Sequence, residues 1–143
     1  MIGVFDTVIL VRGLINPFGW CGRLVFEHFD AYELVVSPAM VSEYLSVLAR
    51  PKLGRKYRSA ENRDLAAIFR LIASATIVQP AQTPAICRDP SDDKFLAAAK
   101  TGLASFIISE DRDLLDLGSY EDIQIVNAET IVRLLEDDAT TRG

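Results

Sequence analysis

The sequence predicts an α/β protein, a three-layer α/β/α sandwich built around a mainly parallel central sheet. Short apolar runs rich in Val, Ile and Phe do not alternate with polar residues, which is typical of strands buried on both faces. Segments with helical spacing lie between these runs, as they do around parallel sheets. Of the 143 residues, 50% are hydrophobic and 24% are charged, which favours one soluble globular domain. We expect this domain over residues 1–137, followed by a short polar tail at 138–143.

Strands are predicted at four apolar runs, with a fifth, weaker candidate near the middle of the chain. The four runs are Ile2–Phe5, Glu33–Val36, Ser105–Ile108 and Ile123–Val126, and the weaker candidate is Thr76–Val78. Ligands of open α/β sheets bind at the carboxyl ends of the strands. The residues that directly follow each run are therefore the first candidates for a functional site.

Three longer helices are predicted from capping signals and from apolar residues at helical spacing. The start signals are Ser37-Pro38, Ser59 and Asp89-Pro90, and the stop signals are Pro51 for the first helix and Gly102 for the third. The residues expected to face inward are Val41, Tyr44, Leu45 and Leu48 in the first helix, Leu65, Ile68, Phe69 and Ile72 in the second, and Phe95, Leu96 and Ala99 in the third. Shorter helices are predicted at Gly22–Phe29, Arg112–Leu117 and Ala128–Leu135.

The charge distribution excludes a globally basic surface for nucleic acid. The net charge is −5, but residues 1–71 carry a balance of +2 and residues 72–143 a balance of −7. This asymmetry permits a local basic patch beside an acidic pocket. The apolar runs are too short to span a membrane, so no membrane partner is expected. The N-terminal segment lacks basic residues and its apolar stretch is interrupted by Asp6, so no signal peptide is expected.

The two cysteines indicate neither a zinc site nor a disulfide framework. Cys21 and Cys87 are far apart in the sequence and are accompanied by one histidine, His28. That set is too small for a Cys/His zinc centre. We expect both thiols to be small core residues of a protein in the reducing cytoplasm.

Carboxylates gather at positions that a parallel sheet would bring together. Asp6 follows the first predicted strand, and Asp111 and Asp113 follow the strand that ends at Ile108. Asp92 and Asp93 lie in the first turn of the helix before that strand, and Glu43 lies in the helix that follows Glu33–Val36. Because the carboxyl ends of parallel strands meet at one edge of the sheet, several carboxylates are expected to converge there.

Oxygen ligands without His or Cys suit hard cations such as Mg²⁺ or Mn²⁺. Such an ion can activate water and stabilise charge on a phosphoryl group. Each acid also has a structural interpretation when it is taken singly. Asp6 can satisfy turn backbone, Asp92 and Asp93 suit a helix start, and Glu43 falls opposite the apolar stripe of its helix. The shared position at one sheet edge favours the functional interpretation.

At this point the chain resembles the PIN-domain family, specifically the ribonuclease toxins of prokaryotic toxin–antitoxin pairs (VapC-like proteins). The resemblance runs almost end to end, through VFDTVILVRGLINP, ELVVSPAMVSEYLSVLARPKL, RDPSDDKFLAAAKTG, FIISEDRDLLDL and IQIVNAETIVRLL. It implies a three-layer α/β/α fold, one or two Mg²⁺ or Mn²⁺ ions, RNA cleavage, a homodimer and neutralisation by a cognate antitoxin.

The acids of this chain match the acids of the family in order and spacing. By resemblance the metal ligands and catalytic residues are Asp6, Glu43, Asp93 in D-x-x-L-A and Asp111 in S-x-D, with Asp113 as an accessory catalytic acid and Asp92 as an alternative to Asp93. Two positions depart from the family pattern. Val8 stands where a polar residue, usually Asn, helps to orient the site, and Ser109 replaces the commoner Thr while keeping a hydroxyl.

A basic segment between two predicted helices suits RNA. Five cations lie within RPKLGRKYR, namely Arg50, Lys52, Arg55, Lys56 and Arg58, and Tyr57 adds a stacking surface. Lys and Arg contacts to phosphate together with base stacking are typical of single-stranded RNA binding. The structural alternative is a solvated connection between the helices.

The sequence therefore predicts a metal-dependent ribonuclease, the toxin of a type II toxin–antitoxin pair, that hydrolyses RNA phosphodiester bonds with Mg²⁺ or Mn²⁺. The alternative is a catalytically weak PIN-fold module that binds RNA or a protein partner without turnover. Val8 motivates this alternative, and manganese-dependent cleavage of RNA distinguishes the two.

Overall fold

A six-stranded sheet with the order β3-β2-β1-β4-β6-β5 runs through the molecule. The computed structural model describes residues 1–50 and 62–142. The strands are β1 (Ile2–Phe5), β2 (Glu33–Val36), β3 (Thr76–Ile77), β4 (Phe106–Ile108), β5 (Ser119–Tyr120) and β6 (Ile123–Val126). Every pairing is parallel except that of β5 with β6. The mainly parallel sheet is confirmed, and β5 is a strand that the sequence pattern did not predict.

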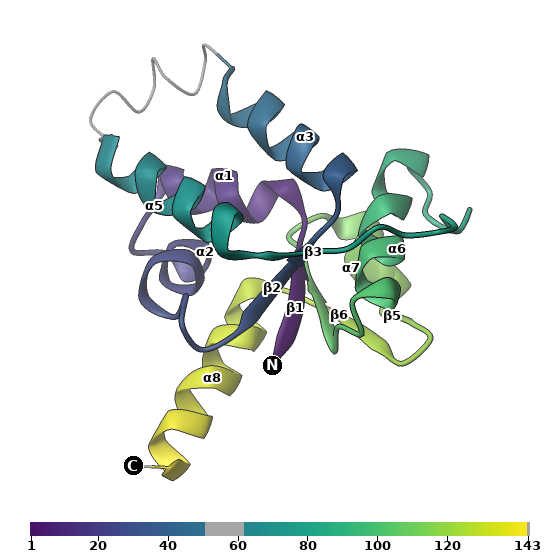
Figure 1. The fold of residues 1–143 in the computed structure, drawn as a ribbon. Helices are drawn as coiled ribbons and strands as arrows, with labels where there is room; N and C mark the ends of the chain where they lie inside the picture. Colours follow the sequence, from purple (N-terminus) through teal and green to yellow (C-terminus); the bar gives the residue numbers. More distant parts are fainter. Residues whose placement is uncertain (51–61, 143) are drawn as a thin grey trace.

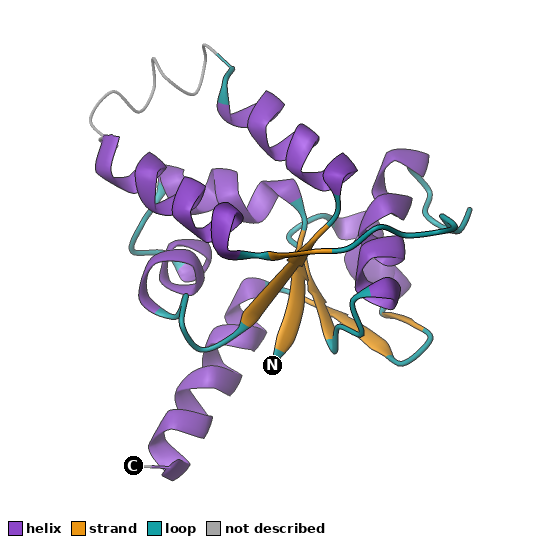
Figure 2. Cartoon of the chain, in the orientation of Figure 1, coloured by secondary structure: helices purple, strands orange, loops and turns teal. Residues whose placement is uncertain are grey.

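Helices cover both faces of this sheet (Figures 1 and 2). In chain order they are α1 (Thr7–Ile15), α2 (Trp20–Gly22), the π-helical turn η1 (Arg23–Glu27), α3 (Pro38–Leu48), α5 (Asn62–Ser74), the 3₁₀ turn η2 (Pro90–Asp92), α6 (Asp93–Thr101), α7 (Arg112–Leu117) and α8 (Ala128–Arg142). Figure 1 shows α1, α2 and α5 on one side of the sheet and α6 and α7 on the other. The three-layer α/β/α sandwich is therefore confirmed.

Helix α1 is the main element that the sequence pattern did not predict. Its nine residues, TVILVRGLI, are almost all apolar, and Val8 and Ile15 are exposed while Ile9, Leu10 and Leu14 are buried. Apolar residues therefore do not distinguish its buried face from its exposed face. The helix begins because Asp6 acts as its N-cap and accepts a hydrogen bond from the backbone N–H of Ile9 at 3.2 Å. Asp6 thus has a structural role at the start of α1 as well as a place at the sheet edge.

Two predicted inward residues are wrong. Leu45 and Phe69 have 45% and 43% of their surface exposed. In α3 the buried residues are Met40, Tyr44 and Leu48, because positions four apart form one row along a helix. In α5 the buried residue that the prediction omitted is Leu71.

The structure also tests the predicted helix boundaries and the predicted burial of the two cysteines. The third helix starts at Asp89-Pro90 as predicted, but through η2, and Gly102 is its C-cap. Helix α8 continues through Arg142 and includes residues 138–142, which we expected to be a tail. Cys21 is buried and Cys87 is half-buried. The Ser59 cap and the Pro51 stop lie outside the described residues.

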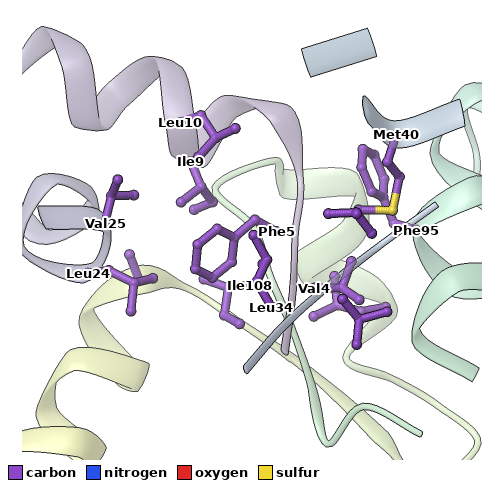
Figure 3. Packing of buried hydrophobic residues seen from close by; sticks show 14 of the residues in the cluster. Val4, Phe5, Ile9, Leu10, Leu24, Val25, Leu34, Met40, Phe95 and Ile108 are labelled. Atoms are coloured by element: carbon purple, nitrogen blue, oxygen red, sulfur yellow. The ribbon is translucent and has the colours of Figure 1, made fainter. Parts of the chain in front are cut away.

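The core lies on both sides of β1, and Figure 3 shows Phe5 at its centre among Ile9, Leu24 and Ile108. The ring of Phe5 packs against Tyr32 with ring centroids 5.3 Å apart. This packing holds the carboxyl end of β1 rigidly, because close-packed interiors resist displacement. Asp6, the next residue in the chain, is thereby held in position.

Among the described residues, no single helix is long and apolar enough to cross a membrane. The segments Thr7–Ile15 and Trp20–Glu27 would together be long and apolar enough for a span, but the chain bends by 107° between them.

Gly22 permits a close crossing that a side chain would prevent. A Cβ at Gly22 would lie 2.2 Å from the carbonyl oxygen of Pro17, whereas a Cβ at Gly13 would lie no closer than 3.5 Å to Cys21. We expect Gly22→Ala to lower the free energy of unfolding by about 1–3 kcal/mol, as overpacking does. Gly13→Ala is the matched control and should not lower it, because alanine favours helix. Urea unfolding of both variants measures this, and equal effects would contradict the close crossing.

Candidate functional site

Two hydrogen-bonded side chains mark the carboxyl ends of the two central strands. β1 pairs with β4 in parallel, with Phe5 opposite Ile108, and the backbone N–H of Asp6 donates to Ile108 at 3.0 Å. This register places Asp6 beside Ser109, whose hydroxyl donates a hydrogen bond to Oδ2 of Asp6. Both residues are buried, with 4% and 0% of their surface exposed. The convergence of residues after these two strands is therefore a direct result of parallel pairing.

The carboxyl group of Asp6 carries an unfavourable charge in this position. The pKa of Asp6 is raised from 3.8 to about 6, mainly by burial and also by the charges of Asp111 and Glu110, against the hydrogen bonds from Ser109 and Ile9. A group whose pKa is raised in this way is a recognised mark of a functional site.

Ser109 also connects Asp6 to Asp111. Its Oγ accepts a hydrogen bond from the backbone N–H of Asp111 at 2.9 Å while its hydroxyl donates to Asp6. Asp111 is the N-cap of α7 and accepts from the backbone N–H of Asp113 at 3.0 Å. One buried serine thus orients the residues that follow β1 and β4.

Asp92 is the acid from the η2–α6 segment that interacts with this pair. The pKa of Asp92 is raised from 3.8 to about 6, mainly by partial burial and also by the charges of Asp111, Asp89 and Asp6, while Lys94 opposes them. Asp92 is half-buried at the last position of η2. Because the charges of Asp6 and Asp111 both act on Asp92, we call Asp6, Asp92 and Asp111 the acidic triad.

Asp93, expected from the family pattern to be the third ligand, has a different environment. Its Oδ1 accepts hydrogen bonds from the backbone N–H groups of Cys87 and Ile86, at 2.8 and 3.1 Å. Burial acts to raise its pKa, but these hydrogen bonds outweigh burial and lower it below 3.8. Asp93 is 5% exposed and anchors the segment before η2. Neighbouring positions on a helix point about 100° apart, so Asp92 and Asp93 face different surroundings.

Glu43 is tied to two other residues. Its Oε2 accepts a hydrogen bond from the hydroxyl of Thr7, and its Oε1 lies 2.7 Å from Nζ of Lys94. Its side chain is 32% exposed, so the solvated helix face expected from the α3 pattern is only partly correct. Thr7 and Lys94 were not singled out from the sequence, although each is adjacent in the chain to one of the acids.

Asp113 lies at the rim of the site. Its Oδ1 forms a 3.0 Å ion pair with Arg88, and both side chains are largely solvated, at 38% and 76% exposure. Of the predicted RNA-binding cations, Arg50 is exposed just after α3. The others, Lys52, Arg55, Lys56 and Arg58, lie outside the described residues.

Glu110 is an acid that sequence reasoning did not select. Its Oε1 accepts a hydrogen bond from the backbone N–H of Ala128 at 3.0 Å and from Sγ of Cys21 at 3.7 Å. Its Oε2 lies 3.8 Å from Arg12. These contacts give Glu110 a structural role at the start of α8, and its position directly after Ser109 was the available signal.

Within residues 1–50 and 62–142, no three His, Cys, Asp or Glu side chains form a ready-made metal cage. The donor chemistry nevertheless fits a hard divalent cation, because the acidic triad offers carboxylate oxygens only. Among the described residues, no Lys or Arg forms an ion pair with Asp6, Asp92 or Asp111. The triad therefore lacks the counter-charge that Glu43 and Asp113 have.

Because Asp92 and Asp93 have different surroundings, we expect their substitution by Asn to change the free energy of unfolding in opposite directions. At pH 7 without metal, Asp92→Asn should raise the free energy of unfolding by about 1 kcal/mol after allowance for solvent screening. Asp93→Asn should lower it by about 1 kcal/mol, because charge-assisted hydrogen bonds are weakened. Denaturant unfolding of the two variants in chelator measures both signs. Destabilisation by Asp92→Asn would contradict the acidic triad.

The stabilisation expected from Asp92→Asn should depend on pH, because it comes from the raised pKa of Asp92. Because the pKa of Asp92 is raised from 3.8 to about 6 in the folded state, wild type loses stability at this site as pH rises through that window. The gain from Asp92→Asn should therefore be present at pH 7 and vanish below pH 3.8, where both folded and unfolded states are protonated. A gain that persists at pH 3.5 would show that it does not come from charge.

Comparisons with known proteins identify the family and the fold of this chain. A family model described as a PIN domain matches residues 3–113. The uncharacterized protein MJ1680 of Methanocaldococcus jannaschii is 35% identical over 117 residues, which are 80% of this chain and 73% of that protein. In fold, the chain is similar to the crystal structure of VapBC2 from Rickettsia felis bound to a DNA fragment from their promoter. That match has a TM-score of 0.57 at 10% identity and covers 89% of this chain and 98% of that one. On the family match and the relative together, the chain belongs to the PIN domain family.

Proposed function

We propose that this protein is a metal-dependent endoribonuclease that hydrolyses RNA phosphodiester bonds. The observation that carries the proposal is the acidic triad at the carboxyl ends of β1 and β4. Two of its members, Asp6 and Asp92, have pKa values raised to about 6 by burial and by mutual repulsion. Uncompensated carboxylates of this kind favour a divalent cation as their counter-charge.

The residues that would hold Mg²⁺ or Mn²⁺ are Asp6, Asp92 and Asp111. Asp92 replaces Asp93 in this proposal, because Oδ1 of Asp93 is occupied by two backbone N–H groups. When bound, such an ion supplies an activated water and stabilises negative charge on phosphate. Ser109 orients Asp6 and Asp111 through its hydroxyl, and Glu43 with Lys94 borders the triad from α3 and α6.

These residues can divide the work of hydrolysis among themselves. Asp6 and Asp92, whose pKa values are raised in the metal-free protein, would release their protons when a cation binds. Lys94 presents a cation beside Glu43, where it can offset charge on a nearby phosphate. Asp113, paired with Arg88, is placed to assist at the rim.

We further propose that RNA reaches the site over the basic segment that begins at Arg50. This segment follows α3, the helix that carries Glu43. The cations of the segment would contact phosphates, and Tyr57 would stack on a base.

The biological role that we propose is the toxin of a type II toxin–antitoxin pair, with a cognate antitoxin partner and a homodimeric state. Support comes from the end-to-end resemblance to VapC-like toxins and from the fold neighbour, which is described as VapBC2. Copurification with the product of an adjacent small gene encoding a DNA-binding protein tests this role.

The second candidate is a PIN-fold module that binds RNA or protein without turnover, and Val8 favours it. Val8 is 37% exposed and provides no polar group at a position where the family usually has one. Thr7, the preceding residue, is buried and donates its hydroxyl to Glu43. We therefore propose that Thr7 orients Glu43 and that the site retains activity.

Removal of one triad charge should abolish most of the activity. Asp6→Asn keeps the shape of the side chain but removes a charged ligand, and we expect RNA cleavage in Mn²⁺ to fall at least about 100-fold. Glu121→Gln, at an exposed ion pair with Lys100, is the control and should cleave like wild type. Cleavage that persists in excess chelator, or equal cleavage by Asp6→Asn, would contradict the metal mechanism.

Loss of the basic segment should change the salt dependence of RNA binding. For the triple change of Arg55, Lys56 and Arg58 to Ala, each lost phosphate contact should lower the slope of log K against log salt by about 0.7. Lys100→Ala, which removes an exposed cation on α6, should leave the slope unchanged. Fluorescence anisotropy with a labelled single strand measures both, and an unchanged slope for the triple variant would mean that RNA binds elsewhere.

A further inference from the structure

A polar groove runs along α6, on the side that faces the segment between β3 and η2. Two adjoining cavities of about 390 and 260 Å³ form this groove, and both are lined by Thr83 and Ala97. Figure 1 shows the chain after β3 crossing α6. We call the space the α6 groove, and it is lined by residues 37–39 and 79–84, one face of α6 and Tyr120.

The α6 groove opens at the border of the candidate site. Lys94 lines its smaller cavity, and Nζ of Lys94 is 2.7 Å from Oε1 of Glu43. Residues 37–39, at the start of α3, line the same cavity, whereas Arg50 follows the other end of α3. Glu43 therefore lies on α3 between the α6 groove and the start of the basic segment.

The lysines of the α6 groove are compensated, and the rest of its lining is neutral. Lys94 pairs with Glu43, and Nζ of Lys100 lies 3.1 Å from Oε1 of Glu121. The described residues that line the groove include no Asp or Glu. Its larger cavity presents an amide, hydroxyl groups and an aromatic ring, which belong to Gln82, Thr83, Thr101 and Tyr120. The α6 groove therefore suits a neutral polar ligand better than a phosphate group.

The wall formed by residues 79–84 is held at both ends. Before it, the backbone N–H of Val78 donates to the carbonyl oxygen of Val36 at 2.8 Å. After it, Oδ1 of Asp93 accepts a hydrogen bond from the backbone N–H of Cys87 at 2.8 Å. Two prolines within the wall restrict its backbone further. A wall fixed in this way loses little conformational entropy when a ligand binds.

Gln82 and Thr83 offer hydrogen-bonding groups that the protein does not use. Both residues are exposed, and neither side chain has a hydrogen-bond partner among the described residues. An amide and a hydroxyl each donate and accept, so they can pair with the edge of a nucleobase. Tyr120 adds an aromatic ring to the same cavity, and unpaired bases stack on such rings. The lining thus provides both kinds of contact by which proteins recognise single-stranded RNA.

We propose that the α6 groove binds one unpaired base of the RNA strand, at a fixed position beside the cleaved bond, and that Gln82 and Thr83 read the hydrogen-bonding edge of this base. The inference rests on the proposed ribonuclease function and gives that function a source of sequence preference. Phosphate contacts along the basic segment would supply affinity for any sequence, whereas the α6 groove would discriminate between bases.

Base preference at single positions of the RNA tests this role. The probe is a labelled single strand that wild type cleaves at one bond, with each of the four bases placed in turn at every flanking position. Fluorescence anisotropy in chelator measures binding without cleavage. Wild type should prefer one base by about 10-fold at one position, as expected for a base edge read by an amide.

The double change of Gln82→Ala with Thr83→Val should reduce this preference to less than about 2-fold. The slope of log K against log salt should stay unchanged, because no phosphate contact is removed. Thr140→Val is the matched control, since it removes an exposed hydroxyl on α8, and it should keep the preference of wild type. Both substituted side chains of the double variant are exposed, and circular dichroism establishes that it is folded.

The possible outcomes separate this inference from the proposed function. A wild type that shows no base preference at any flanking position would overturn the role of the α6 groove and leave a ribonuclease intact. A preference that persists in the folded double variant would overturn it in the same way. Failure of wild type to cleave any RNA in Mn²⁺ would overturn the proposed function itself.

Discussion

The hydroxyl of Ser109 is the interaction on which the rest of the site depends. It donates to Asp6 and accepts from the backbone of Asp111, so it links the ends of two strands that parallel pairing has brought together. A buried hydroxyl that both donates and accepts is fully satisfied. Because Asp6 is also the N-cap of α1, the same carboxylate both starts a helix and lines the site, and neither role can change without the other.

The site is best understood through the way each carboxylate is compensated. Backbone N–H groups compensate Asp93, Arg88 compensates Asp113, and Lys94 compensates Glu43. Hydrogen bonds also reach Asp6 and Asp111, but among the described residues no Lys or Arg forms an ion pair with Asp6, Asp92 or Asp111. Burial raises the pKa of Asp6 and of Asp92.

Much of the fold could be predicted because its signals are local. The runs Ile2–Phe5, Glu33–Val36 and Ile123–Val126 are strands with the predicted bounds, since short runs rich in Val, Ile and Phe favour strands. Helix α1 was missed for the related reason that a helix apolar on most sides has no stripe to detect. Leu45 and Phe69 were placed inward wrongly, because periodicity alone does not define which of two adjacent rows faces the sheet.

The sequence by itself determined the α/β class, the family and the set of acids, because each depends on residue types at fixed spacings. Only the tertiary structure showed that two adjacent aspartates have different surroundings. Asp92 and Asp93 differ by one position in the chain, yet the charges of Asp111 and Asp6 act on Asp92, whereas Asp93 accepts hydrogen bonds from Ile86 and Cys87. The physical reason is that one step along a helix rotates a side chain by about 100°. The contacts made after that rotation come from distant segments, and no local pattern records them.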